Sequence, residues 1–222
     1  MINRKDVKRI VVKVGTSTLT YDTGKINLRR MSKLAQVLSD LKNAGIEVTL
    51  VTSGAIGVGV GKLGLKERPK DTPGRQAAAT VGQCELMYIY DKLFGEYGIS
   101  VAQMLLTKYI LLEDRRKNVE NALERLLTLG VIPIVNENDT VAIDELELEV
   151  GENDSLAAVV ATIARADLLV IMSDIDGLYD CDPRNNKDAK LIPVVHEIDD
   201  SIRNLAGGAG SKFGTGGKKT KI

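Results

Sequence analysis

A regular alternation of short apolar runs with longer stretches of helical periodicity constrains the fold of this chain more than any other feature. The apolar runs predict strands at residues 9–15, 47–54, 100–106, 131–138 and 167–175. Periodic stretches predict helices at residues 28–45, 75–98, 118–130 and 153–166, and residues 140–150 alternate like a small hairpin. Because strand and helix alternate with short connections, we expect one α/β domain, a mainly parallel sheet with helices on both faces.

Small and polar residues follow the predicted strands, in the stretches KVGTS, VTSGAIG, VNEND and MSDIDG. In sheets of this type the carboxyl ends of the strands lie along one edge, and ligands bind in the crevice beyond that edge. We therefore expect the functional site there.

Two glycine turns leave the first two predicted strands, and a lysine interrupts the first strand. Glycine lets backbone N–H groups approach a phosphate closely, and a following helix N-terminus adds partial positive charge. Lys13 would then reach the phosphates as a mobile charge. The alternative is that glycine simply ends each strand and that Lys13 lies at an exposed edge of the sheet. Two such turns together with the lysine favour phosphate binding.

Three common ligand motifs do not fit the sequence. Gly217-Lys218 fails as a Walker A loop, because Lys212 and Lys219 occupy the other required positions. GVGKLG (59–64) has dinucleotide-binding spacing, but it lies well beyond its strand end and no strand follows, which argues against a Rossmann dehydrogenase. In DIDGLYDCD the glycine falls too early for an EF-hand calcium loop.

Two acidic turns, NEND (136–139) and GEND (151–154), echo one another. Asn153 and Asp154 suit either a helix cap or a ligand site, and Asp139 suits either a turn or a ligand site. Since both turns would face the edge of the glycine turns, they indicate an amine-bearing substrate or an organiser of lysines. The late stretch GTGGKKTK suits either a flexible basic segment or a nucleotide lid.

Composition excludes several classes of partner. Lysine plus arginine and aspartate plus glutamate both number 30, so no net charge attracts nucleic acid or anionic lipid. Two distant cysteines and one histidine do not make a structural zinc site. The first residues lack the apolar core of a signal peptide, and no segment reaches about 18 uninterrupted apolar residues. We expect a cytoplasmic protein with no nucleic-acid or membrane partner.

Seven stretches, in order along essentially the whole chain, resemble the glutamate 5-kinases of the amino acid kinase superfamily: VVKVGTSTLT, VTSGAIGVG, RQAAATVGQ, GVIPIVNENDTVA, GENDSLAAVVA, DIDGLYDCDPR and GTGGKKTK. The resemblance implies a three-layer α/β/α sandwich around a mainly parallel sheet. It also implies an enzyme that uses ATP and Mg²⁺ to phosphorylate the γ-carboxylate of L-glutamate to L-glutamyl 5-phosphate, the first step of proline biosynthesis.

The resemblance assigns roles to residues of this sequence. Lys13 and Lys221 would be the catalytic lysines, and Asp154 would orient them. The glutamate site would consist of Ser53, Gly54, Asp139 and Asn153. The ATP site would consist of Lys13, Gly15, Ser173, Asp174, Thr215, Gly216, Gly217, Lys218, Lys219, Thr220 and Lys221. Lys218 departs from the apolar residue usual in the family, and the magnesium ligands are not assigned.

Residues 1–222 are expected to form one amino acid kinase domain that lacks its C-terminal end, with no PUA-type domain. Resemblance also implies a homodimer or homotetramer. Acetylglutamate, carbamate and isopentenyl phosphate kinases remain alternatives, although Asp139 and Asn153 favour a substrate with a free amine. A protein that binds ATP and an amino acid without turnover is a further alternative.

Overall fold

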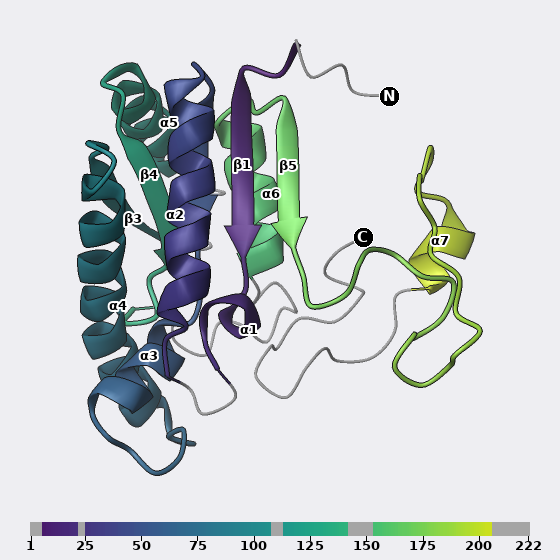
Figure 1. Ribbon diagram of the computed structural model, residues 1–222, viewed down its shortest axis with the longest axis horizontal. Coiled ribbons are helices and arrows are strands. Elements are labelled where there is room, and N and C mark those ends of the chain that lie inside the picture. The colour runs from purple at the N-terminus through teal and green to yellow at the C-terminus, as the bar shows by residue number, and fades with distance from the viewer. Residues whose placement is uncertain (1–5, 22–24, 108–112, 142–152, 206–222) are drawn as a thin grey trace.

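The computed structural model describes residues 6–21, 25–107, 113–141 and 153–205 (Figure 1). Five strands form one sheet in the order β3-β4-β2-β1-β5, and every neighbouring pair is parallel. Their bounds are β1 Arg9–Val14, β2 Glu47–Val51, β3 Val101–Leu106, β4 Ile132–Glu137 and β5 Leu168–Met172. The expected parallel α/β sheet is therefore confirmed.

Helices cover both faces of this sheet. Their bounds are α1 Thr16–Leu19, α2 Leu28–Asn43, α3 Ala55–Lys62, α4 Thr72–Gly95, α5 Glu113–Thr128, α6 Asn153–Ile163 and α7 Asp200–Asn204. Buried residues of α1 to α4 form one apolar cluster with alternate residues of β1, β2 and β4. Residues of α5 and α6 form a second cluster with the intervening strand residues. The sheet is thus the middle of three layers, with α2 in front of it and α6 behind it in Figure 1.

Local sequence explains where the long helices begin and end. Asn27 caps α2 by accepting a hydrogen bond from the N–H of Arg30, and Gly45 follows that helix with a φ of +90°. Asp71 caps α4 in the same way, with proline in the first turn, so α4 begins three residues before the predicted position.

The glycine-rich segment after β2 is itself a helix, α3, which periodicity alone did not delimit. It packs closely against α4: a Cβ atom placed on Gly59 would lie 1.7 Å from the carbonyl oxygen of Ala78. A Cβ atom on Gly82 would lie 1.8 Å from the carbonyl oxygen of Ala55. Glycine at these two positions allows the helix backbones to approach. Most of the predicted hairpin at 140–150 lies outside the described residues.

Candidate active site

The helices that come after β2 and β4 lie on opposite faces of the sheet. After β2 it enters α3 and α4 on one face, and α6, the next described element after β4, lies on the other face. The two strands are neighbours, with Val51 beside Val135. A parallel sheet opens a ligand crevice at such a switch point, beyond the carboxyl ends of the strands. The TSG turn after β2 and the NEND turn at the end of β4 lie at this switch point, and we call the region between them the crevice.

Lys13 lies next to the crevice, inside the sheet rather than at its edge. Its strand, β1, runs between β2 and β5, and the residue is only 9% exposed. The ammonium Nζ lies 2.5 Å from a carboxylate oxygen of Asp154, which is 2% exposed. A Cβ atom on Gly15 would lie 3.5 Å from Nζ, so the charge reaches the glycine turn. The alternative of an exposed edge lysine is therefore wrong.

The two glycine turns contact each other. Gly54 has a φ of +95°, which favours glycine, and a Cβ atom there would lie 3.3 Å from the side chain of Thr16. The hydroxyl of Ser53 donates to the carbonyl of Val14 at 3.1 Å. Because that proton is used, Thr16 donates in the 3.4 Å contact between the Thr16 and Ser53 hydroxyls. The turns after β1 and β2 thus form one connected structure.

Asn153 joins the two sides of the crevice. Its amide nitrogen donates to the carbonyl oxygen of Thr52 at 2.5 Å and to the Oδ1 of Asn136 at 2.9 Å. Both N–H bonds are then used, and within the described residues its own Oδ1 makes no hydrogen bond. The side chain therefore presents a hydrogen-bond acceptor.

Two carboxyl groups lie at the end of β4, and both have raised pKa values. Burial raises the pKa of Glu137 to about 7, with a further contribution from the nearby charge of Asp139. Burial also raises the pKa of Asp139, while the charge of Arg68 acts in the opposite direction. A cationic group bound beside the pair would favour its ionised form.

The remaining predicted ligands lie in two places. Ser173 and Asp174 follow β5, whose Met172 pairs with Val14, so they lie at the same edge as Gly15. Ser173 is half-buried and Asp174 is exposed. The other predicted nucleotide ligands, residues 215–221 including Lys221, lie outside the described residues, as do Gly151 and Glu152 of the GEND turn.

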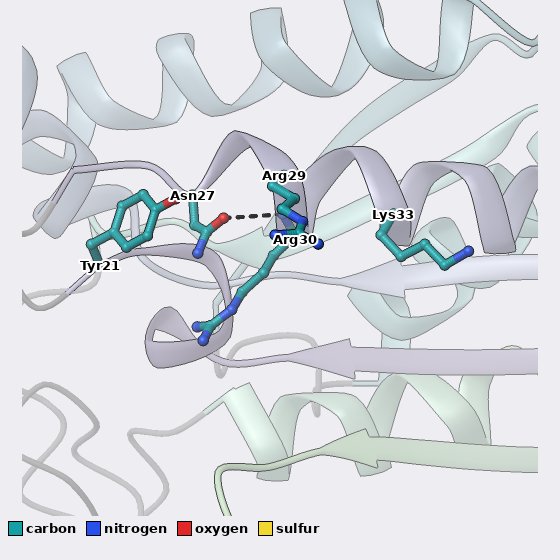
Figure 2. A pocket seen from close by; sticks show the side chains of 5 residues that line it. All are labelled: Tyr21, Asn27, Arg29, Arg30 and Lys33. Carbon is teal, nitrogen blue, oxygen red and sulfur yellow. Dashed lines mark hydrogen bonds between the residues drawn. The ribbon is translucent and has the colours of Figure 1, made fainter.

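A separate basic pocket of about 410 Å³ lies at the start of α2 (Figure 2). Its lining contains none of the predicted site residues; it consists of Tyr21, Asn27, Arg29, Arg30 and Lys33. In Figure 2 the Arg30 side chain extends toward α1, where its Nη1 donates to the carbonyl of Ser17 at 3.1 Å. This arginine of α2 therefore stabilises the turn after β1 without being one of the predicted site residues.

Several polar residues of the site were not assigned to it from the sequence. Thr16 lies in the stretch KVGTS and Asn136 in NEND, but only other residues of these motifs were predicted as site residues. Gln83 and Tyr90 of α4 contact the site turns through Asn136 and Thr52 respectively. A signal was present for Gln83: it stands at helical spacing between the buried Ala79 and Leu86, a polar residue in an apolar stripe.

The described residues contain neither a cluster of metal-ligand side chains nor a membrane-spanning helix. No group of three or more His, Cys, Asp or Glu side chains among them is arranged to hold a metal ion. None of the helices in that part of the chain is long and apolar enough to cross a membrane.

The chain is similar to known proteins over nearly its whole length. The sequence model of the Amino acid kinase family matches residues 8–222. The glutamate 5-kinase of Clostridium perfringens is 58% identical over 221 residues, which is 98% of this chain and 82% of that protein. The glutamate 5-kinase of Listeria innocua is 57% identical over 221 residues, 98% of this chain and 80% of that protein. The glutamate 5-kinase of Thermoanaerobacter sp. is 56% identical over 215 residues, 96% of this chain and 57% of that protein.

Proposed function

Because this chain belongs to the amino acid kinase family, we propose that it transfers the γ-phosphoryl group of ATP to the γ-carboxylate of L-glutamate. The product is L-glutamyl 5-phosphate, and the reaction is the first step of proline biosynthesis. The observation that carries the proposal is a buried ammonium group, paired with Asp154, beside two connected glycine turns. Relatives named glutamate 5-kinase at 56% to 58% identity support the choice of substrate.

The chemistry needs charge neutralisation more than proton transfer. A γ-carboxylate oxygen attacks the γ-phosphorus of ATP, a new P–O bond forms, and the bond from that phosphorus to the β-phosphate oxygen breaks to release ADP. A carboxylate is already a nucleophile, so no general base is required. Lys13 offsets repulsion between the two anions, and Asp154 holds its ammonium in place. Lys221 would supply a second positive charge.

The end of the crevice away from Lys13 has groups that suit an amino acid substrate. The Oδ1 of Asn153, which makes no hydrogen bond within the described residues, and the carboxyl of Asp139 would both accept hydrogen bonds from an α-ammonium group. Ser53 and Gly54 lie between this end and Lys13, where the turn can contact the rest of the substrate. A free amine is what separates glutamate from its N-acetylated form.

Mg²⁺ fits this site as a partner of the nucleotide. Mg²⁺ usually keeps several waters and binds phosphates with one or two carboxylates. When bound, it would reduce the negative charge on the phosphates. Of the predicted nucleotide ligands, the exposed Asp174 at the end of β5 is the carboxylate available to it.

Three further properties remain predictions from the resemblance. They are assembly into a homodimer or homotetramer, a cytoplasmic location, and nucleotide contacts from residues 215–221. Sedimentation analysis tests the first. Nucleotide titration of Lys219→Ala and Lys221→Ala tests the third.

Acceptor specificity tests the proposed function. ADP release is measured with glutamate, N-acetylglutamate, carbamate and isopentenyl phosphate, and hydroxylamine is added to trap any acyl phosphate. We expect release only with glutamate, together with a hydroxamate product. Turnover with another acceptor would move the chain to another branch of the family, and binding of ATP and glutamate without ADP release would make it a binding protein.

A further inference from the structure

A chain of side-chain amides runs from the crevice into the layer between the sheet and α4. Asn153 donates to Asn136 at 2.9 Å, Asn136 donates to the Oε1 of Gln83 at 2.8 Å, and Gln83 donates to the Oε1 of Gln103 at 3.2 Å. Each link passes from an amide N–H to the next amide oxygen. All four amides are therefore oriented in the same sense.

The two middle amides of this hydrogen-bonded row are buried away from water. Asn136 is 2% exposed and Gln83 is 8% exposed. A buried amide that loses a partner leaves a polar group unsatisfied, which is costly, so these two amides hold each other in one orientation. Gln103, at the far end on the edge strand β3, is exposed and can exchange its partner for water.

The donor-to-acceptor direction of this row of amides determines how firmly Asn153 presents an acceptor to a ligand in the crevice. Asn153 gives both N–H bonds to protein oxygens, so its Oδ1 is left for the substrate. If Asn136 turned its amide over, it would present an N–H group to the amide nitrogen of Asn153, and Asn153 would keep only its hydrogen bond to the carbonyl of Thr52. One of the two hydrogen bonds that hold the Oδ1 of Asn153 toward the substrate would then be lost, and the acceptor for the ammonium group would be less well positioned.

We propose that Gln83 is a positioning residue that fixes the orientation of Asn136 and, through it, of Asn153, so that the site accepts a free α-ammonium group. Gln83 acts from α4 and does not touch the substrate. The inference rests on the proposed function, since it assumes that the α-ammonium of glutamate binds at Asn153. Gln83 would thereby contribute to the preference of the site for free amino acids over N-acylated ones.

Replacement of Gln83 by methionine tests the inference, because methionine has a similar length and no amide. We expect Gln83→Met to raise the KM for glutamate about 10- to 100-fold, since a hydrogen bond to a charged group is lost. The KM for ATP should not change, and the preference for glutamate over N-acetylglutamate should fall. Gln103→Met is the matched control, and it should leave both KM values as they are.

A second pair of variants covers the case in which Gln83→Met does not fold. Gln83→Glu can only accept a hydrogen bond, as the native Oε1 does from Asn136, and should keep the glutamate KM. Gln83→Lys can only donate, and should raise that KM. Equal KM values in the pair, or a Gln83→Met variant that loses thermal stability without a change in the glutamate KM, would overturn the inference. A wild-type protein that transfers nothing to glutamate would instead refute the proposed function.

Discussion

At the scale of single residues, Lys13 places a positive charge in a buried position, where an unpaired charge would destabilise the fold. Moving an ammonium group into a buried site costs several kcal/mol unless a partner compensates it, and apolar residues often stabilise such a position equally well. Here Asp154 is the partner, and the ammonium lies beside Gly15 at the carboxyl end of β1. The pair is therefore better explained by a ligand than by stability.

Lys13→Met should affect turnover and stability separately. We expect turnover to fall by about 10²–10³-fold, because a group aimed at the developing charge is lost. The melting temperature should fall too, since Asp154 is left buried without its partner. The double variant Lys13→Met/Asp154→Asn should recover melting temperature but not turnover. Steady-state kinetics and thermal melts measure both, and near-normal turnover in Lys13→Met would remove Lys13 from the mechanism.

Glu137 should make the stability of the protein depend on pH. Its pKa in the folded state is about 7, above the ordinary value of 4.5, so folding favours the protonated form. The stability that this carboxyl contributes is complete below pH 4.5 and is lost as the pH rises through 7. We expect Glu137→Gln, which stays neutral, to raise the melting temperature at pH 8 and to change it little at pH 5.

The control for this prediction is Glu197→Gln, which removes an exposed carboxylate outside the site. Both variants are melted without substrates, so that binding does not contribute. The same shift at both pH values in Glu137→Gln would mean that ionisation of Glu137 does not oppose folding.

At the scale of elements, α4 organises both sides of the crevice. It packs on α3, which begins directly after Gly54, and Gln83 and Tyr90 of α4 hold Asn136 and Thr52. Nearer its start, Gln76 donates to the carbonyl of Thr140 at 3.1 Å. One helix thus fixes the turn after β2 and the turn after β4 relative to each other.

Gly82→Ala tests this packing. The added methyl would lie 1.8 Å from the backbone oxygen of Ala55, so the helices must separate, and we expect destabilisation of about 1–3 kcal/mol or more. Gly95→Ala is the control in the same helix, because a Cβ atom there meets nothing within 4 Å. Chemical denaturation should give an unchanged or slightly higher stability for Gly95→Ala. Equal stability of the two variants would show that α3 and α4 are not closely packed in solution.

The elements themselves were largely predictable from local patterns. Apolar runs located all five strands, and the stripe of Met31 and Leu38 located α2, because these signals depend on neighbours in sequence. The extent of α3 was not predictable, since its glycines have low helix propensity and the helix depends on contact with α4. The role of Gln83 beside the site was not predictable either, because its partner Asn136 lies 53 positions away.

At the scale of the whole molecule, the order of the strands decides which turns meet. Sequence predicted a parallel sheet and a ligand edge, but the order β3-β4-β2-β1-β5 follows from long-range packing that spacing does not reveal. This order puts the TSG turn beside NEND and puts β1 with Lys13 between β2 and β5. The resemblance gave residue roles, and the fold explains why residues from distant segments share one crevice.

The central claim is that the γ-carboxylate of glutamate attacks the phosphorus of ATP, and the most direct test follows a γ-carboxylate oxygen into the released phosphate. Glutamate carrying ¹⁸O at both oxygens of its γ-carboxylate is incubated with ATP, the protein and hydroxylamine, and the mass of the released phosphate is measured by mass spectrometry. If the carboxylate attacks phosphorus, hydroxylamine breaks the acyl C–O bond and each phosphate carries one ¹⁸O atom. Phosphate without the label would mean that water, rather than glutamate, received the phosphoryl group, and would contradict the account.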